Sequence, residues 1–387
     1  MRISQYFMLF FAMLTCLGCS NSGNQVAVAE GQLELVWAVQ PEEAEHEPWF
    51  AGIDRAKILQ DRILIPDWQR NTIIQLNRNG SFLQTIGQTG PGPGEFEGGP
   101  YTLGVSPSGR IWGRLSNPGT FNVYSHDGAF IDIVDHRQLF AGTSINPFDL
   151  IPLADNSCIY HCRIISRRPS TTDEEILQTP LLVRVQGDSW ITLADRWMSN
   201  EEDAVRKRLP KDSRVSLIEA FTSGVACIGQ NQSEILFLKA CAPYTIHRIA
   251  ENQDQSSFTY LEIVREDWTK QFEYSVGEGF EFWPAQRLAS SPRGEPTPYF
   301  TWTHAIQGLA RYGDSLVLHI RMIEQGESHH MLYVVDLNEQ RLVMTVPFDL
   351  PADEMTILSD AFQDGTLVFT VLEPVPGVRV SRIVPTR

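Results

Sequence analysis

The sequence predicts an all-β fold, a six-bladed β-propeller built from four-stranded antiparallel blades, and three observations support this. The text that begins at Arg62 returns at Arg110, and a repeat of about 48 residues is typical of propeller blades. Short runs of alternating apolar and polar residues meet at turn sequences, which is the pattern of half-buried strands. A turn followed by a β-rich strand occurs six times, so six blades are expected.

The N-terminus has the character of a targeting segment. Arg2 precedes an apolar run at 6–14 that is too short to span a bilayer and is followed by polar residues. Residues 16–19 read Cys-Leu-Gly-Cys, which resembles the lipobox of bacterial lipoproteins. The resemblance implies a signal peptide at 1–18, a lipid on Cys19 and a flexible polar tether at 19–31. An ordinary secretory signal with an incidental Cys is the alternative.

Charge and the targeting segment together restrict the partners. The chain has 31 basic and 47 acidic residues, a net charge of −16 and no basic cluster, which excludes a nucleic acid. In lipoproteins of this type an Asp after the lipidated Cys retains the protein at the inner membrane, and this chain has Ser20 there. We therefore expect an exported protein, anchored in the cell envelope by its lipid, at the outer membrane facing the periplasm. Besides the membrane, the expected partner is an envelope protein, a peptide or a sugar.

The blades are placed by the apolar residues that open the strand after each turn. These residues are Ile63, Ile111, Ile159, Ile235, Leu316 and Leu367. Three intervals between them are about 50 residues, one blade each, and the other two are about 80, so each of those holds one blade and an insertion. The insertions are expected near 163–179 and 198–217, and near 267–298. Within the first, 199–209 is predicted to form a short helix, because acids occupy its first turn and bases its last.

The two ends of the chain are expected to share one blade. The last blade supplies only three strands, around 357–361, 367–372 and 378–383, whereas the strand-like run 32–39 has no blade of its own. If this run is the outer strand of the last blade, the ring closes and the exposed sheet edges are hidden. We therefore expect a single domain over 32–387.

Residues 80–87, 90–96 and 103–112 resemble the NHL repeat, found in six-bladed propellers of many exported bacterial proteins. The resemblance extends over about two blades and supports the predicted fold. Asp67 stands where the repeat usually has Asp after the second strand, and Arg114 takes that place in the next blade. The glycine-rich segment 90–94 is expected to carry the chain from the outer strand of one blade to the inner strand of the next.

Four cysteines would remain in the exported domain, Cys158, Cys162, Cys227 and Cys241. Cys158 and Cys162 lie in one expected strand, about 13 Å apart, whereas the Cα atoms of a disulfide lie within about 7 Å. A bridge from this pair to Cys227 or Cys241 and a set of buried free thiols are equal alternatives.

No motif indicates a catalytic residue, a cofactor or a metal. His161 lies between Cys158 and Cys162, but strand alternation directs it to the other face, which argues against a closed metal site. His304 and His319 are expected in the fifth blade, and His329 and His330 in an exposed turn. The sequence contains no nucleophile elbow and no phosphate-binding loop.

The insertion near 267–298 is the candidate surface for a ligand or partner. Its residues considered for binding are Trp268, Tyr274, Phe282, Trp283, Arg287 and Arg293. Aromatic rings mixed with charges suit a sugar, a peptide or a protein, and packing as a hydrophobic cap on the blades is the alternative. The expected function is a lipid-anchored binding or scaffolding module. The alternative is a metal-dependent propeller enzyme of the lyase or lactonase type, which would need His304, His319 and a carboxylate to converge.

Overall fold

The computed structural model describes residues 28–39, 50–141, 143, 145–164, 173–198, 203, 207, 224–228, 234–239, 246–250, 256–258, 272–277, 285–287, 297–302, 304–324, 327–351 and 354–386. The expected signal peptide and the lipidated Cys19 lie outside these residues. Strands dominate the described chain, with a short helix α1 (Asp173–Leu177) and a 3-10 turn η2 (Arg137–Phe140). None of the described helices is long and apolar enough to cross a membrane.

Four antiparallel meanders of four strands each follow one another along the chain. The first contains β2 (Lys57–Leu59), β3 (Arg62–Asp67), β4 (Thr72–Asn77) and β5 (Phe82–Ile86). The second contains β6 (Leu103–Val105), β7 (Ile111–Arg114), β8 (Thr120–Tyr124) and β9 (Phe130–Asp135). The third contains β10 (Ile145–Pro152), β11 (Cys158–Ile164), β12 (Pro180–Gln186) and β13 (Ser189–Asp195). The fourth contains β14 (Gly224–Ile228), β15 (Glu234–Lys239), β16 (Ile246–Ala250) and β17 (Ser256–Phe258).

The remaining large sheet has eight strands, in the order β21-β22-β23-β24-β1-β27-β26-β25. One half contains β21 (His304–Tyr312), β22 (Ser315–Glu324), β23 (Glu327–Asp336) and β24 (Arg341–Phe348). The other half contains β25 (Met355–Ala361), β26 (Thr366–Glu373), β27 (Gly377–Pro385) and β1 (Ala29–Val39). β1 pairs antiparallel with β27, the pairing that the sequence predicts for the N-terminal strand. A short parallel pairing of β1 with β24 joins the two halves, which the sequence did not indicate.

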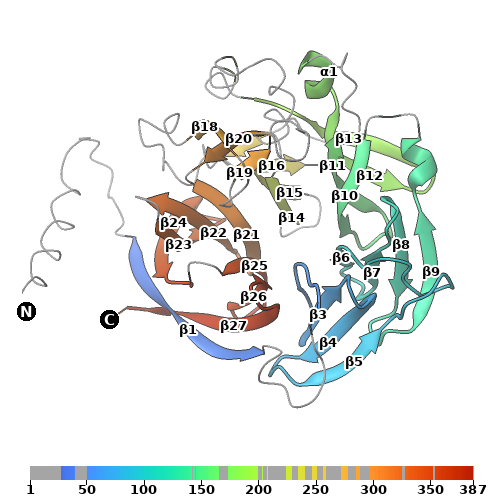
Figure 1. Ribbon diagram of the computed structural model, residues 1–387, viewed down its shortest axis with the longest axis horizontal. Helices are drawn as coiled ribbons and strands as arrows, with labels where there is room; N and C mark the ends of the chain where they lie inside the picture. Colours follow the sequence, from blue (N-terminus) through green and yellow to red (C-terminus); the bar gives the residue numbers. More distant parts are fainter. Residues whose placement is uncertain are drawn as a thin grey trace, which may run out of the picture.

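The sheets stand side by side around a centre, as the blades of a β-propeller do (Figure 1). The first strand of each four-stranded unit lies innermost, and these strands are β2, β6, β10, β14, β21 and β25. They touch one another around the ring, in the runs β21–β25–β2–β6–β10 and β14–β21. At one of these contacts Gly308 lies so close to β25 that an added Cβ would be 2.0 Å from the carbonyl oxygen of Leu358. The ring is therefore packed tightly at its innermost strands.

Hydrophobic clusters fill the spaces between neighbouring units. Among the described residues, six such clusters each combine side chains of two successive units. The cluster that closes the ring packs Ile65 and Leu76 of the first unit against Val368 and Val380 of the last. Each fully buried Leu, Ile or Val contributes about 1.5–3 kcal/mol relative to an exposed one. The packing of unit on unit is therefore the main source of stability.

The residue pattern that resembled the NHL repeat has a clear structural basis at Asp67. Its carboxylate is fully buried and accepts hydrogen bonds from the backbone N–H groups of Ala51 (2.8 Å), Gly52 (3.1 Å) and Arg70 (3.0 Å). These bonds satisfy two amides of the segment before β2 and one amide of the β3–β4 turn, and they hold the segment against the turn. Asp67 is thus a structural residue that fixes where the first inner strand begins.

The regions expected as insertions contain structure of their own. α1 lies within 163–179. Within 198–217, Asp203 and Lys207 are both helical and form an ion pair of 2.5 Å. Between the fourth and fifth units, β18 (Phe272–Gly277), β20 (Thr297–Trp302) and β19 (Ala285–Arg287) form a three-stranded sheet in that order. This sheet spans most of the expected insertion near 267–298 and extends a few residues beyond it.

Candidate functional site

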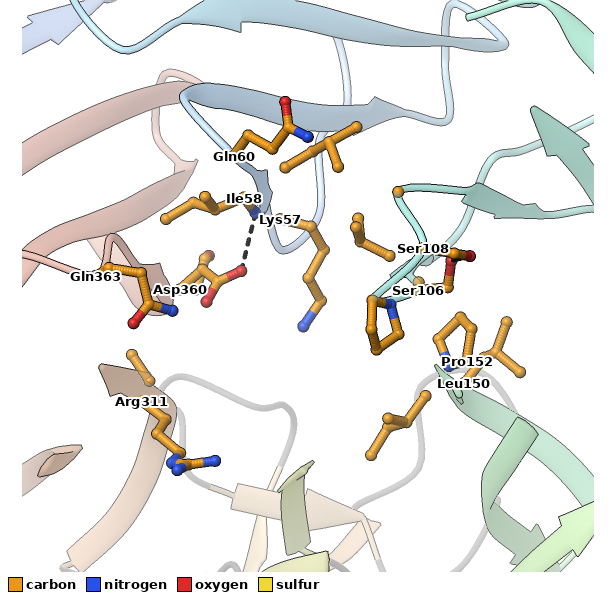
Figure 2. Close-up of a pocket in the computed structure, with 18 of the residues that line it drawn as sticks. Lys57, Ile58, Gln60, Ser106, Ser108, Leu150, Pro152, Arg311, Asp360 and Gln363 are labelled. Atoms are coloured by element: carbon orange, nitrogen blue, oxygen red, sulfur yellow. Dashed lines mark hydrogen bonds between the residues drawn. The ribbon is translucent and has the colours of Figure 1, made fainter. Parts of the chain in front are cut away.

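A cavity of about 670 Å³ lies where the innermost strands meet. All six of these strands contribute residues to its lining, and many of these residues are drawn in Figure 2. The lining residues come from the C-terminal ends of the inner strands and from the turns that follow them. The cavity therefore sits at the face of the ring that carries the hairpins between first and second strands.

Three charged side chains line the cavity, Lys57 from β2, Arg311 from β21 and Asp360 from β25. In Figure 2 the Lys57 ammonium extends into the middle of the cavity, and Arg311 and Asp360 approach it from one side. The carboxylate of Asp360 accepts hydrogen bonds from the backbone N–H of Ile58 (2.9 Å) and of Ala361 (2.9 Å). Burial raises the pKa of Asp360, and the charge of Lys57 and these two amides oppose the rise.

Lys57 differs from its charged neighbours because it makes no hydrogen bond and no ion pair within 4 Å among the residues that the structure describes. It is partly buried and interacts with Asp360 only at longer range. An ammonium group carries three donors, and donors removed from water without a partner cost free energy. The Lys57 ammonium is therefore available to a ligand in the cavity.

The rest of the lining divides into a polar and an apolar part. Ser106 and Ser108 follow β6, and their hydroxyl oxygens lie 2.9 Å apart. Ser106 also accepts a hydrogen bond from the backbone N–H of Arg110 (3.0 Å), which fixes the turn. Leu150 and Pro152 of β10 form an apolar wall of the cavity, on the side opposite Arg311 and Asp360 (Figure 2). A cavity with cations on one side and apolar surface on the other suits a small amphipathic molecule.

The inner strand that carries Lys57 is held by side chains of the neighbouring unit. This strand is at the edge of its sheet, so its outward-facing backbone N–H groups need hydrogen-bond acceptors from outside the sheet. The N–H of Ala56 donates to Oγ1 of Thr370 (3.2 Å), and that of Ile58 donates to Asp360. Ser359 and Thr370 are joined by a hydrogen bond of 2.7 Å. The wall of the cavity on this side is therefore a fixed element rather than a loop.

The opposite face of the ring carries an aromatic and cationic stack. Second strands run antiparallel to inner strands, so the end of β7 lies where the inner strands begin. There the guanidinium of Arg114 lies 5.5 Å from the centre of the Tyr101 ring, a cation–π distance. Trp68, at the end of β3, stacks on Tyr101 with ring centres 6.3 Å apart and planes 14° apart. Trp68 and Tyr101 are both exposed at about two-fifths of their surface, with values of 39% and 36%.

Acidic groups accompany this stack. Asp54 precedes β2, and burial raises the pKa of its carboxyl, opposed by Arg55, whose charge and backbone N–H both favour the charged form. The charge of Asp149 in β10 raises this pKa further, and Arg114 lowers it. Asp149 also lies 3.6 Å from Nδ1 of the buried His161. The two faces of the ring thus carry different chemistry, and the cavity of about 670 Å³ lies at the hairpin face together with its charged side chains.

The aromatic surface predicted from the sequence lies largely outside the described residues. This holds for Trp268, Phe282, Trp283 and Arg293. Tyr274 lies in β18 and Arg287 in β19, and the structure places both on the same three-stranded sheet. Tyr274 is opposite Phe300 of β20, and Arg287 is opposite Tyr299, the adjacent residue. This surface remains a prediction, whereas the described cavity lining comes from the inner strands.

The histidines are placed differently from the prediction. His329 and His330 do not form an exposed turn: both lie in β23, and His330 is buried. His319 is fully buried in β22, and its Nε2 is 2.9 Å from Nδ1 of His330. The hairpin of β22 and β23 extends past both residues, so the polar pair lies within the sheet rather than at its end. His304 lies in β21, of which only the backbone is described at this position.

A metal ligand set is not visible in the described part of the chain, where no three His, Cys, Asp or Glu side chains are grouped to hold an ion. Cys158 and Cys162 are buried free thiols, so of the two alternatives for this pair the structure has free thiols rather than a bridge to Cys227 or Cys241. Burial raises the pKa of each thiol to about 12, so both are unreactive packing residues. The side chain of Cys227 and the whole of Cys241 lie outside the described residues.

Comparisons with known proteins agree on the fold. A family model described as a 6-bladed β-propeller matches residues 43–97. No curated protein matches the chain. A member of the DUF4221 family from Bacteroides vulgatus has a similar structure, with a TM-score of 0.55 at 9% identity over 92% of this chain and 99% of that one. A Bacteroides fragilis protein named as exported has a TM-score of 0.51 at 12% identity, over 91% and 95% of the two chains.

A third similar structure is a protein of unknown function from Bacteroides thetaiotaomicron. Its TM-score is 0.50 at 9% identity, over 92% of this chain and 77% of that one. At these identities the similarity concerns the fold alone, and it extends over most of every chain compared. Together with the ring of sheets, it identifies the protein as an all-β propeller.

Proposed function

We propose that this protein is a six-bladed β-propeller of the cell envelope, anchored by lipid, that binds a small ligand in its central cavity. The observation that carries the proposal is the cavity of about 670 Å³, lined by the inner strands of all six four-stranded units. Its size lies within the range of about 300–1,000 Å³ typical of small-molecule sites. The six units support a count of six blades, and so does the description of the matching family.

The composition of the lining supports binding as the role of this site. Its described groups are two cations, one carboxylate, apolar side chains such as Leu150, and uncharged polar side chains, which are those of Gln60, Ser106, Ser108, Ser359 and Gln363. The carboxylate, Asp360, already holds two backbone amides, so it shapes the wall rather than standing free for proton transfer. Convergent polar groups against an apolar wall fix the orientation of a ligand, which is the task of a binding module.

Export and anchoring are supported by the N-terminal sequence. A short apolar run ends in Cys19 and is followed by a polar segment, as a lipid-anchored domain requires. A structural neighbour of the same fold is named as an exported protein. We infer that the ring stands in the periplasm, held near the outer membrane by its N-terminal tether, with the N-terminal strand β1 tied into the ring by β27.

Closing the cavity should remove the ligand. Gln363 and Ser108 lie on exposed turns at its lining, so Gln363→Trp combined with Ser108→Trp is expected to fill the opening and leave the core intact. Protein purified gently from its own envelope should carry a bound molecule in native mass spectrometry, and the double variant should carry less than about a tenth as much.

The control for this experiment is Asp188→Trp, which adds the same bulky ring on the exposed β12–β13 turn outside the cavity. It should retain the ligand at the wild-type level. If the wild-type protein carries no molecule, or if the blocked variant carries as much as the wild type, the proposed function is wrong.

The lipid anchor has a separate test. Cys19→Ala removes the thiol that would be acylated, and the protein should then move almost entirely from the membrane fraction to the soluble periplasmic fraction. Cell fractionation, together with the intact mass of the membrane-bound form, measures this. Cys16→Ala, which alters the other N-terminal cysteine, should leave the protein at the membrane. Retention of the Cys19→Ala protein in the membrane would refute the anchor.

A further inference from the structure

We propose that the central cavity recognises its ligand through an anionic group, a carboxylate or phosphate on a small apolar skeleton, with Lys57 as the principal contact. This inference rests on the proposed function, because it names the class of ligand for the same cavity. It is carried by the charge of the lining, by the hydrogen bonding of Asp360 and by the position of the apolar wall.

The described lining has an excess of positive charge in a chain that is strongly acidic overall. Lys57 and Arg311 outnumber the one carboxylate, Asp360, whereas the whole protein has a net charge of −16. A recessed positive site with low-dielectric walls concentrates anions even when the rest of the surface repels them. The contrast between cavity and surface thus favours an anion over a cation or a neutral molecule.

The single carboxylate does not neutralise Lys57 by direct contact. Asp360 directs one oxygen to the N–H of Ile58 and the other to that of Ala361, both at 2.9 Å, and lies more than 4 Å from the Lys57 ammonium. This arrangement holds the carboxylate at the wall, while the Lys57 side chain extends past it into the cavity (Figure 2). An oxyanion between Lys57 and Arg311 would supply the hydrogen bonds that the ammonium lacks among the described residues.

The two cations come from different strands on the cationic side of the cavity, which sets the location of the anionic group. Lys57 extends from β2 and Arg311 from β21, two strands that are both in contact with β25. Because both lie on or at the ends of strands, their positions are fixed by sheet pairing. Leu150 and Pro152 of β10 provide apolar contact on the far side, where the carbon skeleton of the ligand would lie (Figure 2).

The test uses butyrate and butyl phosphate as probes, with butyramide as the uncharged counterpart of butyrate, at constant ionic strength. Isothermal titration and thermal shift of the full-length domain should show binding of one or both anions and none of butyramide. Lys57→Met should weaken anion binding by about tenfold to a hundredfold, the usual effect of losing a charged hydrogen bond. Lys57→Arg should largely restore it.

Lys207→Met is the matched control, because it removes the same charge from an exposed helical residue outside the cavity lining. It should bind the anions as the wild type does. The comparison of butyrate with butyl phosphate decides between carboxylate and phosphate as the group recognised.

Equal binding of butyramide and butyrate would overturn the proposal, and so would unchanged binding by Lys57→Met or no binding of either anion. The failure of this proposal can be told apart from the failure of the proposed function. A native ligand that is lost from the blocked variant Gln363→Trp with Ser108→Trp, but is retained by Lys57→Met, would keep the binding function and refute only the anionic class.

Discussion

Replacing Glu354 by Ala is expected to lower the free energy of unfolding by about 3 kcal/mol. Arg379 donates two parallel hydrogen bonds to its carboxylate, at 2.6 and 2.7 Å, and Thr356 donates a third. Glu354 is only 7% exposed, so the change leaves a partly buried guanidinium and a buried hydroxyl without their acceptor. The pair also joins the residue before β25 to β27 across β26, and its loss should loosen the unit that closes the ring.

Urea or thermal unfolding measures the effect, and a double-mutant cycle with Arg379→Ala separates pairing from packing. If the ion pair acts as a unit, the double variant should lose clearly less than the sum of the two single variants. The exposed pair of Arg341 and Glu339 is the matched comparison, since its side chains are 38% and 55% exposed. Glu339→Ala should cost no more than about 1 kcal/mol. Equal costs for Glu354→Ala and Glu339→Ala would contradict this account of the buried pair.

The repeat revealed the second strand of each unit, and it did so for a physical reason. The six apolar residues used to place the blades all lie in second strands, from Ile63 in β3 to Leu367 in β26. These strands lie in the middle of each unit and are covered on both faces, so they read as continuous apolar runs after a turn. The role of β1 was predictable for a related reason, because a strand without a partner and a unit lacking one strand complement each other.

The candidate site could not be predicted in the same way. Its walls come from six inner strands spread along the chain, and two of them, β2 and β6, are only three residues long. Three residues carry no measurable periodicity, so nothing in the sequence marks Lys57 as a cavity residue. One signal was available: each inner strand directly precedes a strand found by the repeat, so the inner strands and their charges could have been located by counting back from it.

The histidine pair illustrates a misread local signal. Two adjacent histidines suggested a turn, but alternation continues through them, with His330, Leu332 and Val334 all buried. The polar side chain at His330 is accommodated because His319 on the neighbouring strand is its hydrogen-bond partner. Sequence patterns show that a position is polar, but they do not show that a polar partner lies within reach on the neighbouring strand.

Lowering the pH from 7.5 to 5 is expected to destabilise the protein through this pair. Burial lowers the pKa of His330 to about 4, and the charges of Arg321 and His329 add to the effect, opposed by Asp349. Burial, His330 and Arg321 lower the pKa of His319 well below its usual value. Both histidines are therefore neutral in the folded protein, and each bonds and packs in that form, beside Phe348.

The sign follows from proton binding in the two states. Below about pH 6.5 the unfolded chain protonates these histidines and the folded protein does not, so stability is complete above that pH and decreases toward pH 4. His330 alone should account for a loss of about 2 kcal/mol at pH 5, and His319 adds to it. Asp54 and Asp360 act in the opposite direction, because burial raises their pKa in the folded state. Acidification removes the cost of holding these buried carboxyls in the charged form, so it acts against the loss caused by the histidines.

Urea unfolding at pH 7.5, 6 and 5 in buffers of equal ionic strength measures the slope. His330→Gln should be less stable than the wild type at pH 7.5 but lose less stability on acidification, since one of the two protonation sites is gone. His126→Gln, at an exposed turn, should retain the wild-type slope. The same slope in the wild type and His330→Gln would place the acid sensitivity elsewhere. A shallower slope in His330→Gln alone would identify the buried imidazole pair as the part of the ring that limits its stability in acid.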